Sequence, residues 1–374
     1  MDSEVAITVG ALRDALDRRF PPAWAEPWDC VGLVVGDAGA TVAGVLVTLD
    51  ATAEAVGRAV DSGATVLVTH HPPFLEPPSF VDRGAGPAGT LQAAVRHDVA
   101  VLSYHTSLDR APDGASALAL ELGLAPSGPL ESGVEAVAHV VTYVPAASVE
   151  DVRLAMEHAG AGRLGEYEGC AFAADGRGWF RPLGGTTPSV PPSDDGVAEV
   201  RLEMVAAPAD VNAVLEAARE AHPYEEPLIV ATQGARSRGV ARLGRVCTLS
   251  EGETVASIGA RVARALHVRP RIWGDPTRPV QVVAVANGSA GSLIPAAARR
   301  GADVLIAGEV RYHDALEARA SGMCIIEAGH DATEWPLVDV LARACRLALP
   351  SSVAVTAEAA ALGWWTWEGS DERR

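Results

Sequence analysis

The sequence contains no lysine, and acidic residues outnumber basic ones. All 30 basic residues are arginines, against 48 aspartates and glutamates, which gives a formal net charge of −18 at pH 7. Such a chain repels phosphate backbones, and no basic run is long enough to follow a nucleic acid, so generic nucleic-acid binding is excluded. A small phosphorylated substrate is not excluded, because a locally bound divalent cation can dominate the field that a phosphate experiences.

Cysteines and long apolar runs are also scarce. The five cysteines are scattered without Cys-x-x-Cys spacing, which argues against a disulfide framework and a zinc–thiolate site. No run approaches the roughly 18 to 20 uncharged apolar residues of a membrane span. The opening residues Met1 to Val5 contain neither a basic stretch nor an apolar signal core. We therefore expect no membrane association, a cytoplasmic location, and cysteines that are buried thiols.

The order of apolar segments predicts an α/β protein with an inserted domain. Strand and helix patterns alternate over the first hundred residues and again after Leu243, and Pro- and Gly-rich linkers lie at 125–129 and 233–239. We predict a discontinuous β/α core domain from residues 1–125 and 236–374, interrupted at 126–235 by an α+β domain of the ferredoxin-like type. A Gly-Ala turn followed by an apolar strand occurs at 63–71 and again at 301–309, so the core should consist of two related halves.

Two adjacent histidines, His70 and His71, end the apolar strand that begins at Val66, and Pro72 and Pro73 stop it. Successive strand residues point to opposite sides, so each histidine can face a different metal ion. The position also suits a site, because α/β sheets keep their sites at the carboxyl ends of strands. The alternative is a pair of loop histidines without a ligand role.

Two more polar clusters follow predicted strands: His105 with Asp109, and His330 with Glu334. Because parallel strands bring their carboxyl ends to one rim, we expect the three clusters to meet. Histidine and carboxylate ligands without cysteine suit zinc, iron(II), manganese or cobalt, and a hydrolytic two-metal site is the resulting hypothesis. Each cluster has a structural alternative: Asp109 can form a turn, and Glu334 can be favoured by a helix dipole.

Two other polar segments are predicted to be structural. They are His222-Pro-Tyr-Glu-Glu-Pro227 and the Gly-rich turn at 287–292, which matches neither the dinucleotide-binding nor the P-loop pattern.

Taken together, the motifs resemble the GTP cyclohydrolase I type 2 homologues, also called the NIF-three-like dinuclear-metal proteins. The matching motifs are Trp28-Asp29-x-Val31-Gly32-Leu33-x-x-Gly36, Thr69-His70-His71-Pro72, His105-Thr106-x-x-Asp109, Gly308-Glu309-x-x-Tyr312-His313 and Gly329-His330-x-x-x-Glu334. They cover nearly the whole predicted core, and their joint order is highly specific. One departure is Cys30, where the family's Trp-Asp-Asn motif has asparagine, which concerns substrate contacts more than metal binding.

The resemblance implies a specific site. His71 and Asp109 would hold one divalent ion, His70 and His330 a second, and Glu334 would bridge the two. His105, Glu309 and His313 would hold the ligands in place or transfer protons, with His105 and Glu309 as catalytic candidates.

The resemblance also implies a toroidal homohexamer whose sites face an internal cavity, and an insert of the PII-like type. Two functions then compete. The first is a metal-dependent hydrolase acting on a nucleotide or another small heterocyclic substrate. The second is a non-catalytic metal-binding hexameric scaffold, or a regulatory ring that senses a ligand through the insert.

Overall fold

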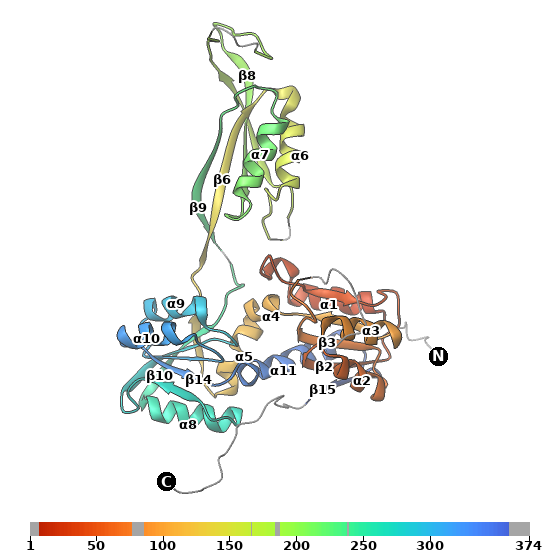
Figure 1. Ribbon diagram of the computed structural model, residues 1–374, viewed down its shortest axis with the longest axis vertical. Helices are drawn as coiled ribbons and strands as arrows, with labels where there is room; N and C mark the ends of the chain where they lie inside the picture. The colour runs from red at the N-terminus through yellow and green to blue at the C-terminus, as the bar shows by residue number, and fades with distance from the viewer. Residues whose placement is uncertain (1–6, 77–85, 166, 184–187, 238, 359–374) are drawn as a thin grey trace. The chain divides into compact units, whose positions relative to one another are not determined.

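The computed structural model describes residues 7–76, 86–165, 167–183, 188–237 and 239–358 (Figure 1). The chain divides into two compact units: a core unit, Met1–Ser132 with Gly239–Arg374, and an inserted unit, Gly133–Arg238. The core unit extends further than residue 125, where we expected the insert to begin. Strand β5 (Pro126–Pro129) pairs with the core strand β10 (Arg245–Thr254), so this segment belongs to the core. No helix in the described ranges is long and apolar enough to span a membrane.

The first half of the core unit is a five-stranded sheet of order β1-β4-β3-β2-β15. Its central strand β3 has Val66, Leu67 and Val68 fully buried, as expected for a parallel strand covered on both faces. The side chain of Thr52 accepts the Ala55 N–H and so caps α2, which leads into β3. The elements of this half are α1 (Val9–Arg19), β1 (Gly32–Val35), β2 (Gly44–Asp50), α2 (Ala53–Asp61), β3 (Val66–His71), α3 (Pro87–Arg96), β4 (Ala100–Ser103) and, late in the chain, β15 (Ala354–Ala357).

The second half is a six-stranded sheet of order β11-β14-β13-β12-β10-β5. Thr254 and Ser257 form a capping box at the start of α8, the helix that follows β10. The further elements are α8 (Val255–Leu266), β11 (Arg271–Trp273), β12 (Pro279–Val285), α9 (Ile294–Arg299), β13 (Val304–Ala307), α10 (Tyr312–Ala320) and β14 (Cys324–Glu327).

The two halves share one topology. In each, three parallel strands lie in reverse chain order beside an antiparallel edge strand: β1-β4-β3-β2 in the first sheet and β11-β14-β13-β12 in the second. This observation confirms that the core consists of two related halves. The expectation of one common rim was wrong, because β3 and β4 belong to one sheet and β14 to the other.

The halves are joined by two helices, each of which packs into the other half's core. Helix α5 (Pro112–Glu121) follows the first sheet, but its Leu118 is buried with Ile258 and Val283 of the second half. Helix α11 (His330–Ala348) follows β14, but its Leu337 and Leu341 are buried against the strands of the first sheet. This exchange places the start of α11 beside the carboxyl end of β3.

The inserted unit is a four-stranded antiparallel sheet of order β7-β8-β6-β9 with two helices. The β-α-β-β-α-β order of its elements is the ferredoxin-like arrangement. Its His222 is buried and contacts the Tyr143 carbonyl oxygen at 3.0 Å through Nε2, which supports the structural interpretation of that segment. The elements are β6 (Val134–Val144), α6 (Val149–His158), β7 (Ala171–Gly178), β8 (Val197–Ala206), α7 (Val211–Ala221) and β9 (Ile229–Ser237).

Candidate metal centre

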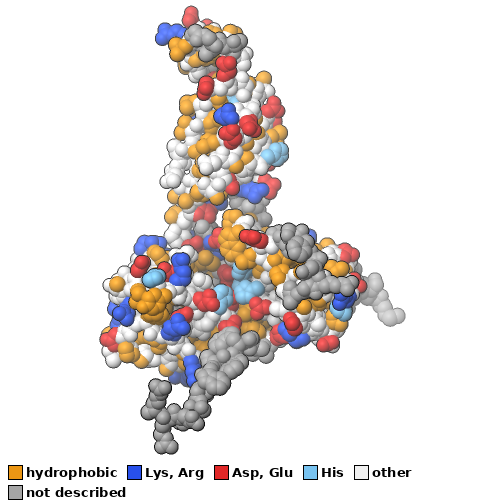
Figure 2. Space-filling view, in the orientation of Figure 1, with side chains coloured by type: hydrophobic (Ala, Val, Ile, Leu, Met, Phe, Trp, Pro, Cys, Tyr) orange, Lys and Arg blue, Asp and Glu red, His pale blue; other side chains and the backbone are white. Residues whose placement is uncertain are grey.

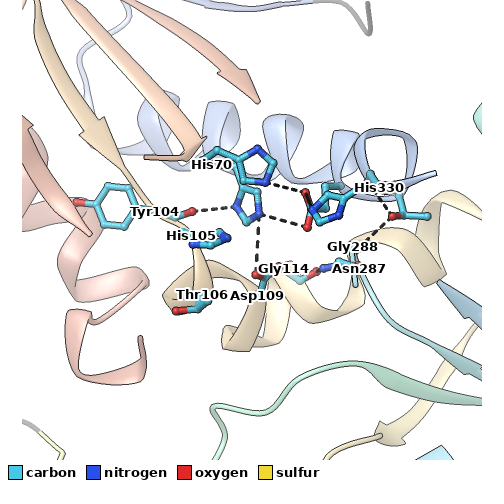
Figure 3. A network of polar contacts seen from close by, with 12 residues as sticks. His70, Tyr104, His105, Thr106, Asp109, Gly114, Asn287, Gly288 and His330 are labelled. Atoms are coloured by element: carbon cyan, nitrogen blue, oxygen red, sulfur yellow. Dashed lines mark hydrogen bonds and ion pairs between the residues drawn. The ribbon is translucent and has the colours of Figure 1, made fainter. Parts of the chain in front are cut away.

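Strand β3 delivers His70 and His71 to one polar cluster in the core unit (Figure 3). The His70 side chain is fully buried, and its Nδ1 donates to the Tyr104 carbonyl oxygen at 3.0 Å. Nδ1 of His71 lies 2.8 Å from Oδ1 of Asp50, the last residue of the neighbouring strand β2. Both rings are therefore oriented by oxygen acceptors, as metal-binding histidines usually are.

Helix α4 (Thr106–Arg110) follows β4 and brings His105 and Asp109 to the same cluster. His105 directly precedes the helix, and its ring centroid lies 5.1 Å from that of His70 and 5.5 Å from that of His71. Asp109 lies in the helix with its side chain largely buried.

Helix α11 supplies the last two members, His330 and Glu334. The helix begins at His330, although Thr333 is the residue type in this segment that most often caps a helix. Gly329, at φ 99°, occupies the cap position instead, and Pro336 consequently lies inside the helix. His330 and Glu334 are thus one helical turn apart, and Nε2 of His330 lies 3.1 Å from Oε2 of Glu334.

The ligand atoms form overlapping groups, two of which share the buried carboxylate of Glu334. One consists of His70, Asp109 and Glu334, and the other of His71, His330 and Glu334. Nε2 of His71 lies 2.9 Å from Oε2 of Glu334, whereas Nε2 of His70 lies 3.7 Å from its Oε1. Distance therefore pairs His70 with Asp109 and His71 with His330, the reverse of the pairing implied by the resemblance. A third group joins His70 and His71 to His105.

The spacing between His70 and Asp109 fits two ligands of one metal ion better than a hydrogen bond. His70 Nε2 lies 3.9 Å from Asp109 Oδ2, which is too far for a hydrogen bond. Two atoms that each lie about 2.0 to 2.2 Å from one ion are about 3 to 4 Å apart. In addition, His70 Nε2 and Asp109 Oδ1 are buried without a hydrogen-bond partner among the described residues. Buried polar atoms are rarely left unpaired, so the donor set suits a divalent ion.

The electrostatics of the cluster place negative charge on Glu334 and protons on two histidines. Burial opposes ionisation of Glu334, but hydrogen bonds from His330 and His71 outweigh it and hold the pKa of Glu334 well below its usual value. Burial would lower the pKa of His71, yet Asp50 and Glu334 raise it to about 10. The hydrogen bond to Glu334 raises the pKa of His330 to about 9. Burial raises the pKa of Asp109.

Gly288 leaves space for the side chains of the cluster. The sequence did not reveal this role. A Cβ atom on Gly288 would lie 2.0 Å from Oε1 of Glu334 and 3.1 Å from Nε2 of His330. The turn at 287–292, which we interpreted as structural, therefore lies directly against the candidate metal ligands. Asn287 anchors it by donating to the Gly114 carbonyl oxygen at 3.1 Å.

Arg110, the residue after Asp109, ties this helix to the segments that lead to the inserted unit. Its buried guanidinium forms ion pairs with Glu26 and Glu131, and its carbonyl oxygen accepts from Arg242 N at 2.9 Å. Glu131 also accepts from Leu243 N at 3.0 Å. We call Arg110, Glu26 and Glu131 the Arg110 clamp.

Other residues singled out from the sequence lie at the edge of the cluster or outside it. The exposed Glu309 contacts His330 Nδ1 at 3.3 Å through Oε2. His313, on α10, is in none of the three metal-type groups, and its ring lies 5.5 Å from that of Tyr312. Cys30 is half-buried with a free thiol.

Two carboxylates were missed or misjudged in the sequence. Asp50, which the sequence shows only as a carboxylate after an apolar run, orients His71. Asp29 lies in a Gly-rich segment typical of an exposed turn, yet its side chain is fully buried against His105. The sequence signal for Asp29 was its place beside Trp28 in the first motif, whereas Asp50 had no signal beyond its position at the end of a strand.

The histidine and acidic side chains also gather at one place on the visible face of the space-filling view (Figure 2). His330 and His71 are partly exposed, with 36% and 24% of their side-chain surface accessible. The cluster is therefore reachable from solvent.

The chain is similar to known proteins over nearly its whole length. The family described as Duf34/NIF3 (NGG1p interacting factor 3) matches residues 7–361. A GTP cyclohydrolase 1 type 2 homolog of Mycobacterium leprae is 35% identical over 332 residues, 86% of each chain. One of Bacillus subtilis is 35% identical over 323 residues, 83% of this chain and 84% of that one. A solved Bacillus cereus protein related to NIF3 has a TM-score of 0.65 at 28% identity, covering 97% of this chain and 99% of that one.

Proposed function

The chain belongs to the Duf34/NIF3 family, and we propose that it binds two divalent metal ions and acts as a metal-dependent hydrolase on a nucleotide or another small heterocyclic substrate. The family membership confirms the resemblance that the sequence motifs indicated. One observation carries the proposal: the two groups that share Glu334 bring together donors from β3, α4 and α11, three elements that lie far apart in the sequence.

In this proposal His70 and Asp109 hold one ion, His71 and His330 hold the other, and Glu334 contacts both. A shared carboxylate is the usual way to offset the repulsion between two neighbouring cations. The donor set of imidazoles and carboxylates favours zinc, iron(II), manganese or cobalt. The ions would supply Lewis acidity and lower the pKa of bound water. The Tyr104 carbonyl and Asp50 would orient the histidine ligands. A substrate would approach from the exposed side of His71 and His330.

The substrate class rests on the chemistry of the site and on the relatives' name. Several relatives are called GTP cyclohydrolase 1 type 2 homologs, which supports purine nucleotides as the first class to test. The net charge of −18 does not oppose this choice, because divalent ions offset it locally.

The activity experiment compares metal-loaded and chelator-treated protein against a panel of nucleotides, nucleosides and phosphoesters. Turnover of a heterocyclic substrate that requires metal and is lost in Glu334→Ala supports the hydrolase. If no member of the panel reacts with fully metal-loaded protein, the non-catalytic scaffold becomes the better interpretation.

The metal proposal predicts an order of ligand losses. Glu334→Ala removes a donor and a negative charge from both groups, so both ions should be lost, whereas His70→Ala and His71→Ala should each lose mainly one. Metal bound only to the folded state stabilises it by about 3 to 4 kcal/mol at several hundred times Kd, so melting temperatures should fall in the same order. Elemental analysis per chain measures the stoichiometry.

Asp14→Asn is the control, because the exposed Asp14 pairs with Arg13 and belongs to none of the metal-type groups. Its metal content should equal that of the wild type. Two ions per chain in Glu334→Ala would contradict the shared carboxylate.

We further propose the homohexamer that the family resemblance implies. Native mass spectrometry should then give six copies of the 38.7-kDa chain. A monomer or dimer at micromolar concentration would remove this part of the proposal without affecting the metal site.

A further inference from the structure

Each of the four clustered histidines has an oxygen acceptor at Nδ1. The acceptors are the Tyr104 carbonyl for His70, Asp50 for His71, Glu309 for His330 and Asp29 for His105. A neutral imidazole that donates from Nδ1 carries its lone pair on Nε2. In its neutral form, each ring therefore offers Nε2 to a metal ion or to a hydrogen-bond donor.

The hydrogen bonds of Asp29 hold His105 in one orientation. Its side chain is fully buried, and Oδ1 lies 3.0 Å from His105 Nδ1 and accepts the Cys30 N–H at 2.8 Å. Its Oδ2 accepts from Thr106 N at 2.9 Å and from Thr106 Oγ1 at 2.5 Å. Burial would raise the pKa of Asp29, but these donors lower it to about 2, so the carboxylate is ionised. Such a carboxylate fixes both the tautomer and the ring plane of His105.

His105 has a different position from the other three histidines. Among the described residues, both metal-type groups that contain Glu334 are complete without it, and its own group contains no carboxylate. Its ring nevertheless lies within 5.5 Å of the rings of His70 and His71. Trp28, whose side chain is more than half exposed, packs edge-on against it at 5.9 Å. The ring thus has one side toward the cluster and one toward an exposed aromatic residue.

We propose that His105 is the site's hydrogen-bond acceptor for a ligand that carries an N–H or O–H group next to its metal-binding atom, and that Asp29 is the positioning residue that directs His105 Nε2 toward that ligand. The inference rests on the proposed metal site and deepens it, because it assigns a ligand class. Ligands with a proton donor beside the coordinating oxygen, such as a hydroxamate or a cyclic amide, should be favoured over ligands without one.

The experiment uses the full-length protein loaded with cobalt(II), whose visible spectrum reports on its ligands. Two probes are titrated: acetohydroxamic acid, which keeps an N–H donor when it binds a metal, and azide, which has none. In His105→Ala the acetohydroxamic acid affinity should fall about tenfold, the effect of one hydrogen bond, while azide affinity stays within about twofold. His105→Gln, which keeps an acceptor near the Nε2 position, should recover part of the loss.

Asp29→Asn keeps the volume of the side chain and should reproduce the selective loss of acetohydroxamic acid affinity with unchanged cobalt content. Asp50→Asn is the matched control, since Asp50 makes the same contact with His71. Because His71 is a proposed metal ligand, Asp50→Asn should instead weaken cobalt binding and alter the spectrum.

The outcomes separate this inference from the metal proposal. Failure of the wild type to bind cobalt removes the proposed function. Normal cobalt binding with equal losses for both probes in His105→Ala and Asp29→Asn overturns only the acceptor role. Loss of cobalt or a changed spectrum in His105→Ala shows that His105 is a metal ligand, which also overturns the inference.

Discussion

Gly288 provides the most direct test of the cluster at the level of single residues. Gly288→Ala would place a methyl group 2.0 Å from the position of Glu334 Oε1, at a φ of 55° that non-glycine residues rarely adopt. We expect metal affinity to fall by at least about tenfold, because Glu334 and His330 must move together. Isothermal titration with zinc measures it.

Gly291→Ala is the matched control in the same turn. A Cβ atom there meets nothing within 4 Å among the described residues. Its metal affinity should equal that of the wild type. Equal weakening in both variants would mean that the turn matters through its flexibility and not through the space beside Glu334.

The protonation of His71 and His330 predicts how metal binding depends on pH. Their pKa values are raised to about 10 and about 9, so both rings carry protons at pH 7.5, and a metal must displace them. Binding should therefore release about two protons from these rings at pH 7.5, and affinity should rise with pH until about 10. Titrations in buffers of different ionisation enthalpy count the protons.

Asp50→Asn serves as the comparison, since it removes a charge that raises the pKa of His71. Fewer protons should then be released at pH 7.5. Release that is near zero in the wild type, or that grows between pH 8 and pH 10, would show that the rings are neutral before binding.

The residues of the site could be predicted from the sequence, but which of them lie next to one another could not. His70, His71, His105, Asp109, His330 and Glu334 all follow predicted strands, and the structure brings them together. The pairing of His70 with Asp109 depends on how α4 turns after β4, which no local pattern encodes. The burial of Asp29 likewise depends on Thr106, which is 77 residues away.

The sequence predicted the kinds of helices and strands in the core, but not which helix packs against which sheet. Alternating strands and helices indicated parallel β/α halves, and the repeated Gly-Ala turn at 63–71 and 301–309 indicated that the halves are related. Local patterns did not show that α5 and α11 exchange partners, because both helices are apolar on the face that packs and either core would bury it. The start of α11 cannot be read from the sequence, because Thr333 resembles a cap, whereas its Oγ1 accepts from Gly288 N at 3.1 Å.

Helix α4 is fastened by the Arg110 clamp, which predicts a large effect from a single change. Arg110→Met would remove the buried guanidinium that pairs with the carboxylates of Glu26 and Glu131, so the free energy of unfolding should fall by about 3 kcal/mol. Urea unfolding of metal-free protein measures the change.

Arg19→Gln is a suitable control, because Arg19 and its partner Asp113 are both more than 40% exposed. Its effect should stay below about 1 kcal/mol. A similarly small effect of Arg110→Met would show that the clamp does not hold α4.

On the scale of the whole molecule, the division into two units predicts that the insert is dispensable for metal binding. None of the candidate ligands lies between residues 133 and 238. The flanking segments are adjacent, since Leu130 N donates to Gly244 O at 3.1 Å and Glu131 N to Leu243 O at 3.0 Å. Replacing 133–238 with a short Gly-Ser linker should leave a folded protein with the metal content of the wild type, measured by elemental analysis and circular dichroism.

The comparison variant is the larger deletion of 126–235, which follows the boundary expected from the sequence. It removes β5 and its pairing with β10, so it should be less stable. An insoluble 133–238 deletion alongside a stable 126–235 deletion would contradict the boundary.

The Arg110 clamp also gives the molecule a path for mechanical load. Both segments that connect to the inserted unit are fastened at Arg110: Glu131 through its carboxylate, and Arg242 through its N–H. Tension applied through β6 and β9 should therefore reach Arg110, one peptide bond from Asp109, as well as the paired backbone at 130–131 and 243–244. A pull on the insert should thus strain the carboxylate beside His70, and a metal bound there as proposed should be released at a lower force than that at which the core unfolds.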